Sequence, residues 1–266
     1  MRSLNGIGKA RRLRGGKRYL VYRSPHEGTR LRGGVLMPDD RETFYMQRPE
    51  RGWGTPLTVD LLRMSVSAVE RAAPLGTQLV IGDLSRAGGG CLPPHRSHRG
   101  GLDVDIGYYF RGGDQHRWMR LATAATLDAD RTWLLLEAFV TSGRLQYAFI
   151  DYDLQRLLHA AALRSGRTAA ELAPIFQYPR PLDQARSAII RHLKGHADHM
   201  HVRFTCPPSG PCVLADGLAA QVQDVHFVRR GGARAEDLHG AARSPTSRPS
   251  LVRRWRRSVA TAGLLR

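Results

Sequence analysis

The chain has 266 residues, 42% of them hydrophobic, and a formal net charge of +18 at pH 7, which fits one sizeable globular domain or two small ones. No run approaches the roughly 20 apolar residues of a membrane-spanning helix, and residues 1–20 lack the apolar stretch of a signal peptide, so either the chain stays inside the cell or an export segment precedes it. The charge lies at the two ends, without a zinc finger or a basic strand with interleaved aromatic residues, which argues against specific nucleic-acid binding.

Charge and composition divide the chain into three parts. Residues 1–33 carry ten Lys or Arg and one acidic residue, and predict an extended basic lead-in. Residues 34–228 are nearly neutral, with 21 basic and 20 acidic residues, and hold the elements of one domain. Residues 229–266 carry ten Arg and two acidic residues, and their composition predicts a disordered tail. Both ends are expected to bind polyanions or anionic lipid without sequence preference.

The predicted elements follow one another through the central part. Thr55 as N-cap and Pro56 in the first turn begin a helix, and apolar residues at helical spacing continue it over 56–73. Residues 77–81 predict a buried strand. After it come a Gly-rich loop at 87–90, a strand at 102–106, a helix at 133–142, a strand at 145–150, a helix at 151–164, a proline-containing loop at 179–181, a helix at 182–194 and a strand at 199–204.

Together these elements predict an α+β fold. We expect a single domain with a small antiparallel sheet that carries the functional site and helices that pack around it. The Gly88 to Gly90 run lacks the Lys-Ser/Thr of a phosphate loop, and is expected to form a flexible wall of a cleft.

The three cysteines leave two alternatives open. Cys206 and Cys212 bracket a Pro-Pro-Ser-Gly-Pro turn, and can either close a short disulfide loop or remain two unpaired thiols. A disulfide would imply an oxidising compartment. Cys91 is left over.

Six of the eleven histidines fall in two short segments. The first segment holds His95 and His98, ahead of the strand with Asp103 and Asp105, and the second holds His192, His196, His199 and His201.

The strand pattern gathers polar side chains on one face. His199 and His201 lie two apart on one predicted strand and share a face, as two aspartates do on the other. A catalytic zinc site takes three His or carboxylate ligands and leaves one position open for water. A His before one strand, a carboxylate on it and a His on the second strand supply such a set, whereas the helical H-E-x-x-H motif is absent.

These residues resemble the penicillin-insensitive murein endopeptidases, within the wider group of lysostaphin-type, D-Ala-D-Ala and hedgehog-like zinc peptidases. The group shares an H-x(6)-D motif and a later H-x-H, which this sequence matches at 98–105 and 199–201. The resemblance covers about residues 50–212. Within that range it includes, besides the two motifs, residues 79–83 before the first motif and Cys206 after the second. The basic ends have no counterpart, and no second metal site is matched.

The resemblance implies one zinc ion held by His98, Asp105 and His201. It implies that His199, the first His of the H-x-H motif, is catalytic rather than a ligand. Such a histidine can act as a general base toward water and then protonate the leaving amine.

Two further histidines match residues that line the site of the family. His95 is expected as an additional metal ligand, as a donor to the developing oxyanion or as a rim residue. His196 is expected as a catalytic residue, as a donor to the developing oxyanion or as a group that orients a neighbour. Asp103 is expected to pair with an arginine or to cap a turn rather than to bind metal. Asp198 is expected to point away from His199 into solvent, and His192 to lie on a helix surface.

The resemblance therefore implies a zinc-dependent murein DD-endopeptidase. Its substrate would be the D-Ala to meso-diaminopimelate cross-link of peptidoglycan, and its location the periplasm. A D-Ala-D-Ala carboxypeptidase or dipeptidase of the same group remains an alternative, although those relatives favour a Glu base. A non-catalytic cell-wall or nucleic-acid binding protein that uses the basic ends is a second alternative.

Overall fold

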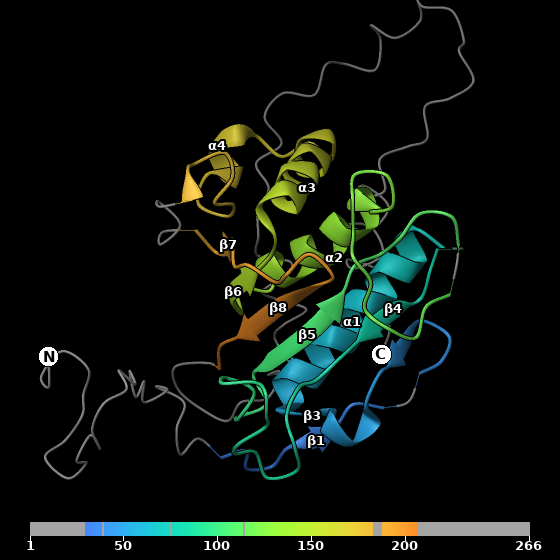
Figure 1. Ribbon diagram of the computed structural model, residues 1–266, viewed down its shortest axis with the longest axis vertical. Coiled ribbons are helices and arrows are strands. Elements are labelled where there is room, and N and C mark those ends of the chain that lie inside the picture. The colour runs from blue at the N-terminus through green and yellow to red at the C-terminus, as the bar shows by residue number, and fades with distance from the viewer. Residues whose placement is uncertain (1–29, 39, 75, 114, 183–187, 207–266) are drawn as a thin grey trace, which may run out of the picture.

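The computed structural model of the chain describes residues 30–38, 40–74, 76–113, 115–182 and 188–206. Two sheets and four α-helices form in these ranges (Figure 1). In chain order the elements are β1 (Val35–Leu36), β2 (Phe44–Met46), the 3-10 helix η1 (Pro49–Arg51), β3 (Trp53–Gly54), α1 (Pro56–Ala72), β4 (Leu79–Ile81), β5 (Asp103–Gly107), α2 (Ala129–Thr141), β6 (Leu145–Phe149), α3 (Tyr152–Arg164), α4 (Ala169–Leu172), β7 (Ile190–Arg191) and β8 (His199–Phe204).

The larger sheet has six strands in the order β2-β4-β5-β8-β6-β7. Its inner pairings, β4–β5, β5–β8 and β8–β6, are antiparallel, whereas the outer pairings, β2–β4 and β6–β7, are parallel. The predicted α+β class is confirmed, and the expected small antiparallel sheet is the centre of a larger mixed one. β1 and β3 form a separate antiparallel pair.

The two central strands, β5 and β8, separate an apolar face from a polar one. Successive side chains of a strand point to opposite faces of the sheet. The alternation of apolar and polar residues in the sequence therefore determines the composition of both faces. The apolar face belongs to the buried core and carries Val104, Ile106, Met200, Val202 and Phe204. The polar face carries Asp103, Asp105, His199, His201 and Arg203. The pattern that buries the core therefore also places the candidate site.

Helices α1 and α2 lie against the sheet (Figure 1). α1 begins where the Thr55 hydroxyl accepts a hydrogen bond from the backbone N–H of Thr58, with Pro56 in the first turn, as predicted. Its fully buried residues Leu62, Val66 and Val69 recur three or four positions apart, so one side of the helix enters the core.

Most predicted elements are confirmed with shifted ends. The helix predicted over 182–194 is wrong at its C-terminal end, where β7 pairs with β6; residues 183–187 lie outside the described ranges. Ile190 of β7 is fully buried in the core opposite Ala148 of β6, so tertiary pairing overrides the local helical pattern.

Several predictions about the ends remain untested. The basic lead-in is described only from Arg30 onward, and the tail at 229–266 lies outside the described ranges. Within those ranges, every helix is too short or too polar to cross a membrane.

Candidate metal centre and active site

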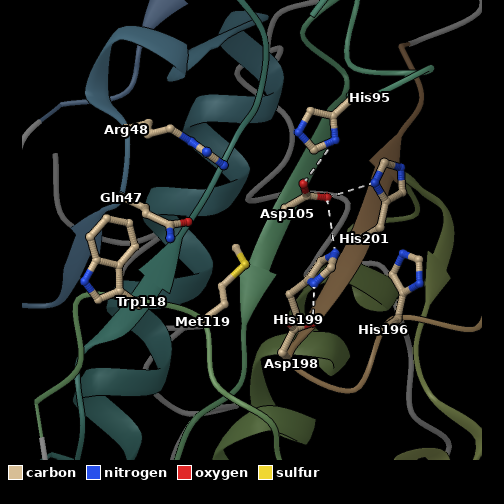
Figure 2. A pocket seen from close by; sticks show the side chains of 10 residues that line it. All are labelled: Gln47, Arg48, His95, Asp105, Trp118, Met119, His196, Asp198, His199 and His201. Carbon is tan, nitrogen blue, oxygen red and sulfur yellow. Dashed lines mark hydrogen bonds and ion pairs between the residues drawn. The ribbon is translucent and has the colours of Figure 1, made fainter. Parts of the chain in front are cut away.

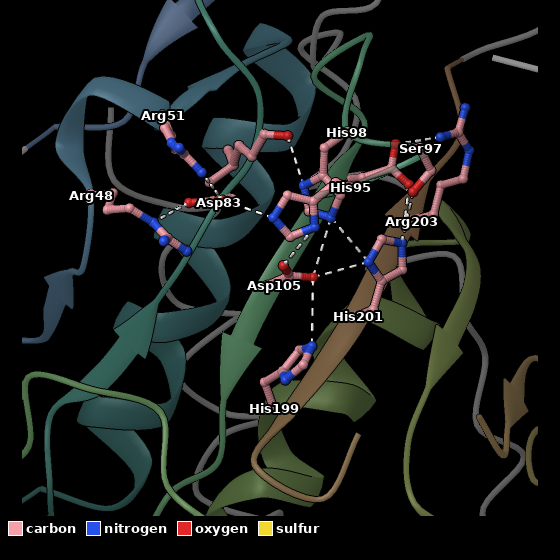
Figure 3. A network of polar contacts seen from close by, with 12 residues as sticks. Arg48, Arg51, Asp83, His95, Ser97, His98, Asp105, His199, His201 and Arg203 are labelled. Atoms are coloured by element: carbon pink, nitrogen blue, oxygen red, sulfur yellow. Dashed lines mark hydrogen bonds and ion pairs between the residues drawn. The ribbon is translucent and has the colours of Figure 1, made fainter. Parts of the chain in front are cut away.

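Two antiparallel strands bring the first two candidate ligands together. Asp105 on β5 and His201 on β8 are direct cross-strand partners, so their side chains project side by side. Asp105 Oδ1 lies 3.0 Å from His201 Nδ1. His98, from the loop before β5, completes a triangle, because its Nε2 lies 3.1 Å from His201 Nδ1 and 3.2 Å from Asp105 Oδ1 (Figure 3).

Partners on the far side of each ring fix how the two histidines are presented. His98 Nδ1 lies 2.9 Å from the carbonyl oxygen of Leu84. Because a carbonyl only accepts, Nδ1 carries the proton and Nε2 turns a lone pair toward the triangle. His201 Nε2 lies 3.2 Å from Asp103 Oδ1, and Asp103 is paired in turn with Arg203, as predicted. Histidines that bind metals are oriented in this way.

His95 adds a fourth donor beside the triangle. Its Nδ1 lies 3.5 Å from Asp105 Oδ2, and its Nε2 lies 2.8 Å from Asp83 Oδ2. The Asp83 carboxylate accepts the Nε2 proton, so Nδ1 is left with a lone pair. Ligand atoms of His95, His98 and Asp105 all lie within 4.8 Å of one another. This geometry favours His95 as a ligand over His95 as a donor to an oxyanion.

The size and chemistry of the triangle fit a zinc ion. Ligand distances of about 2.1 Å in a tetrahedral zinc site place the ligand atoms about 3.4 Å apart, and the sides of the triangle measure 3.0 to 3.2 Å. Imidazole and carboxylate are zinc ligands. His98, Asp105 and His201 are only 1%, 5% and 7% exposed, which shields them from competing solvent.

The electrostatics of the triangle stabilise a positively charged group next to the Asp105 carboxylate. Burial by itself would raise the pKa of Asp105, but the hydrogen bond from His201 and the neighbouring His98 hold it well below its usual range. Burial by itself would lower the pKa of His201, but its bonds with Asp103 and Asp105 outweigh that effect and raise the pKa to about 9. A metal that binds here would release that proton.

His199 lies beside the triangle and is held by its sequence neighbour. Its Nε2 lies 4.0 Å from Asp105 Oδ1, and its Nδ1 lies 2.7 Å from Asp198 Oδ1 (Figure 2). The expectation that Asp198 points away from His199 is therefore wrong. Asp198 lies in the bend before β8, where the alternation of a strand does not apply. Because the carboxylate accepts the Nδ1 proton, Nε2 carries a lone pair on the side of the triangle, the form a general base needs.

His196 lies next to His199, with ring centroids 4.8 Å apart. Its Nδ1 lies 3.1 Å from the carbonyl oxygen of Leu193, so Nδ1 carries the proton. Burial, followed by the neighbouring His199 and His201, lowers the pKa of His196 and favours its neutral form. In that form Nε2 accepts rather than donates, which does not suit His196 as a donor to an oxyanion.

The cleft at this site has a volume of about 520 Å³ and two walls (Figure 2). We call the first the ligand wall; it consists of His95, Asp105, His196, Asp198, His199 and His201. We call the second the facing wall; it consists of Gln47, Arg48, Trp118 and Met119. Met119 lies against Gly82, where an added Cβ would come within 2.5 Å of its methyl group.

The Gly88 to Gly90 run does not form a wall of this cleft, contrary to expectation. The loop is pinned elsewhere: Gly90 N–H donates to the carbonyl oxygen of Arg99 at 2.9 Å. Gly89 has φ +72°, and a Cβ there would lie 2.2 Å from that same oxygen. Glycine is thus required by close backbone approach.

Asp83 connects the two walls, and pattern reasoning alone missed this role. Its side chain is fully buried and contacts Arg48 Nε at 2.7 Å, Arg51 Nη1 at 2.9 Å and His95 Nε2 at 2.8 Å (Figure 3). Burial by itself would raise the pKa of Asp83, but hydrogen bonds from His95 and Arg51 and the charge of Arg48 lower it to about 2. Its sequence signals were its position just after a buried strand and the family resemblance over residues 79–83, and neither indicated this role.

Other supporting residues were also missed. The hydroxyl of buried Tyr108 donates to the carbonyl oxygens of His196 at 2.8 Å and His199 at 3.1 Å, and so holds the bend before β8. His192 is not on a helix surface; its Nδ1 accepts the backbone N–H of Tyr152 at 2.9 Å. Both contacts join segments far apart in the sequence, so no local pattern announces them.

The predicted disulfide remains a prediction. Cys206 lies at the end of the described ranges, and its expected partner Cys212 lies outside them. Cys91 is an exposed, free cysteine.

Comparison with known proteins finds relatives of this chain. The sequence model of a family described as penicillin-insensitive murein endopeptidase matches residues 26–221, which include both walls of the cleft. A protein named penicillin-insensitive murein endopeptidase from Haemophilus influenzae is 30% identical over 191 residues, covering 66% of this chain and 60% of the relative. One of the same name from Yersinia enterocolitica is 29% identical over 200 residues, covering 72% and 66%. The matched part of the chain thus spans less than two thirds of each relative.

Proposed function

The chain belongs to the penicillin-insensitive murein endopeptidase family, and on that premise we propose that it is a zinc-dependent DD-endopeptidase. Its proposed substrate is the D-Ala to meso-diaminopimelate cross-link of peptidoglycan. Its proposed location is the periplasm, where that polymer is accessible, and its basic ends would contact polyanions or anionic lipid there.

One observation carries the proposal: three potential ligand atoms converge within 3.0 to 3.2 Å of one another, and two of the three residues, Asp105 and His201, line the cleft. The proposed ligands of a single zinc ion are His98 through Nε2, Asp105 through Oδ1 and His201 through Nδ1. His95 is the proposed fourth donor, available from the side through Nδ1.

In this proposal the chain itself moves the proton. Zinc, when bound, supplies a Lewis acid that polarises the scissile carbonyl and makes water a better nucleophile. His199 Nε2 accepts a proton from the attacking water and returns it to the leaving amine. Asp198 keeps the proton of His199 on Nδ1 and stabilises the imidazolium form between these two steps. His196 Nε2, as an acceptor, would hold a substrate N–H or a water molecule.

A second candidate is a D-Ala-D-Ala carboxypeptidase, which breaks an amide of the same chemical kind. The observation that favours the endopeptidase is that the cleft has the facing wall in addition to the ligand wall. A cross-link extends on both sides of the scissile bond, so it can contact both walls. The proposed base is a histidine rather than a glutamate, which agrees with this preference.

Metal analysis and digestion of defined muropeptides test the proposal together. The full chain, purified and loaded with zinc, should carry about one zinc ion and convert a cross-linked dimer into two monomers. A pentapeptide monomer ending in D-Ala-D-Ala serves as the competing substrate. Release of free D-Ala without dimer cleavage would support the carboxypeptidase, and a zinc-free chain that cleaves the dimer at full rate would overturn zinc dependence.

A further inference from the structure

The facing wall carries an excess of positive charge that the proposed chemistry does not use. One buried carboxylate, Asp83, stands between Arg48 and Arg51 (Figure 3). A single carboxylate balances one of the two guanidinium charges. Of the two arginines, Arg48 lines the cleft, so the remaining charge is available to a ligand there.

Arg48 presents its free edge to the cleft. Its ion pair with Asp83 uses Nε, at 2.7 Å, and the side chain is 42% exposed. An arginine held through Nε keeps its two terminal amino groups for a second acceptor, and their spacing matches a carboxylate. Because Asp83 is fully buried and also bonded to Arg51 and His95, the guanidinium is fixed before any ligand arrives.

The rest of the cleft separates charges of opposite sign. Asp198, on the ligand wall, lies beside His199 and is 40% exposed. A substrate carboxylate would be repelled from that side and attracted to Arg48 on the facing wall. Figure 2 shows the two groups on opposite sides of Asp105. The cleft therefore has a polarity that orients an anionic substrate.

We propose that Arg48 is a specificity residue that binds a free carboxylate on the leaving-amine side of the scissile amide. This inference rests on the proposed function, because it assigns a substrate feature to the same site. In diaminopimelate, the carbon that bears the leaving amine also bears a carboxylate. Binding of that carboxylate by Arg48 positions the amine for protonation and excludes amides that lack the charge.

A paired-substrate experiment tests this assignment. The cross-linked muropeptide dimer is prepared with that carboxylate free and with it converted to a primary amide. The wild-type chain should prefer the free acid by about 10- to 100-fold in kcat/KM, the usual worth of a charged hydrogen bond. Arg48→Ala should lose a similar factor on the free acid and discriminate less than about threefold. Arg48→Lys should fall between them, because lysine keeps the charge but lacks the fork.

Arg51→Ala is the matched control. It also removes one arginine from Asp83 but does not line the cleft, so the preference for the free acid should remain. Zinc content should stay unchanged in all three variants. Equal losses on both substrates in Arg48→Ala would show that Arg48 acts on the scissile carbonyl, and loss of zinc or an equal effect of Arg51→Ala would show a structural role. Either result overturns the proposal.

A binding measurement separates this inference from the proposed function. The full chain, with zinc and after zinc removal by EDTA, is titrated with the uncross-linked tetrapeptide stem and with its diaminopimelate amide. Tighter binding of the acid in both states, lost in Arg48→Ala, supports the carboxylate site even if neither dimer is cleaved. A preference that disappears with EDTA and ignores Arg48→Ala places the carboxylate on the metal and overturns it.

Discussion

The two walls of the cleft are built in different ways. On the ligand wall, Asp105 and His201 are less than a tenth exposed, and each histidine ring has a partner for its second nitrogen. On the facing wall, Arg48 is 42% exposed in its side chain and Trp118 is 66% exposed. The first wall buries its atoms among hydrogen-bond partners, whereas the second leaves side chains exposed to contact a ligand.

This difference agrees with the proposed division between a wall for chemistry and a wall for recognition. Ligands and a general base must be held within a fraction of an ångström of their working positions, which requires supporting hydrogen bonds. A recognition surface gains by burying exposed side chains when substrate binds. Substitutions on the ligand wall should therefore cost far more activity than those on the facing wall.

The largest loss of activity is expected from substitutions in the triangle of His98, Asp105 and His201. Asp105→Ala or His201→Ala removes one of three converging donors, so the purified variants should lose their zinc and their hydrolytic activity together. Plasma emission spectroscopy and dimer digestion measure the two quantities. His159→Ala, on α3 away from the cleft, is the control and should keep both. Full activity in a zinc-free triangle variant would contradict the ligand assignment.

The next largest effect is expected beside the triangle. His199→Ala should keep its zinc and lose about two to four orders of magnitude in kcat, the usual contribution of a general base. Asp198→Asn should keep its zinc and lose less, about 10- to 100-fold, because the base remains but loses its orienting carboxylate. Asp153→Asn, an exposed aspartate of α3, is the control. If His199→Ala is metal-free, His199 is a ligand instead.

The connection between the walls should appear as a pH dependence of stability. The pKa of Asp83 is about 2 in the folded chain and about 4 in an unfolded one, so the unfolded state binds the proton more readily. The contribution of the ionised Asp83 to the free energy of unfolding is complete above about pH 4 and is lost as the pH falls toward about 2. At about 1.4 kcal/mol per pKa unit, reduced for the partial exposure of the arginines, it amounts to about 1 to 2 kcal/mol.

Urea unfolding in EDTA measures this contribution. The difference in unfolding free energy between the wild-type chain and Asp83→Asn should shrink by most of that amount between about pH 5 and about pH 2.5. A difference that stays constant over this range would show that Asp83 does not titrate there.

The smallest effect is expected at the edge of the facing wall. Trp118→Ala removes an exposed ring that lines the cleft. We expect kcat/KM to fall about fivefold, because burial of this ring on substrate binding should contribute about 1 kcal/mol. Zinc content and stability should not change. Leu121→Ala, at a 72% exposed residue outside the cleft lining, is the matched control. Equal effects of both substitutions would show that Trp118 makes no specific contact.

Local pattern was sufficient to predict the strands that carry the candidate ligands. Period-two alternation predicted β5 and β8, and the bounds of β8 agree with the prediction at both ends. The paired His and Asp residues on those strands indicated the candidate metal site, because alternation fixes which side chains share a face. The helix predicted over 182–194 is wrong because a short apolar run is compatible with either a helix or a buried strand, and only pairing with β6 decides.

By itself, the sequence determined the α+β class, the strands that carry the candidate ligands and the family, since periodicity and motif spacing are local properties of the chain. Only the tertiary structure decided that Asp105 and His201 face each other across two strands, that Asp83 joins Arg48 to His95 and that Asp198 turns toward His199. These contacts depend on strand register and on loop paths, which form when distant segments pack together. For that reason the histidines and Asp105 of the ligand wall could be predicted from the sequence, whereas the orientation of Asp198 and the facing wall could not.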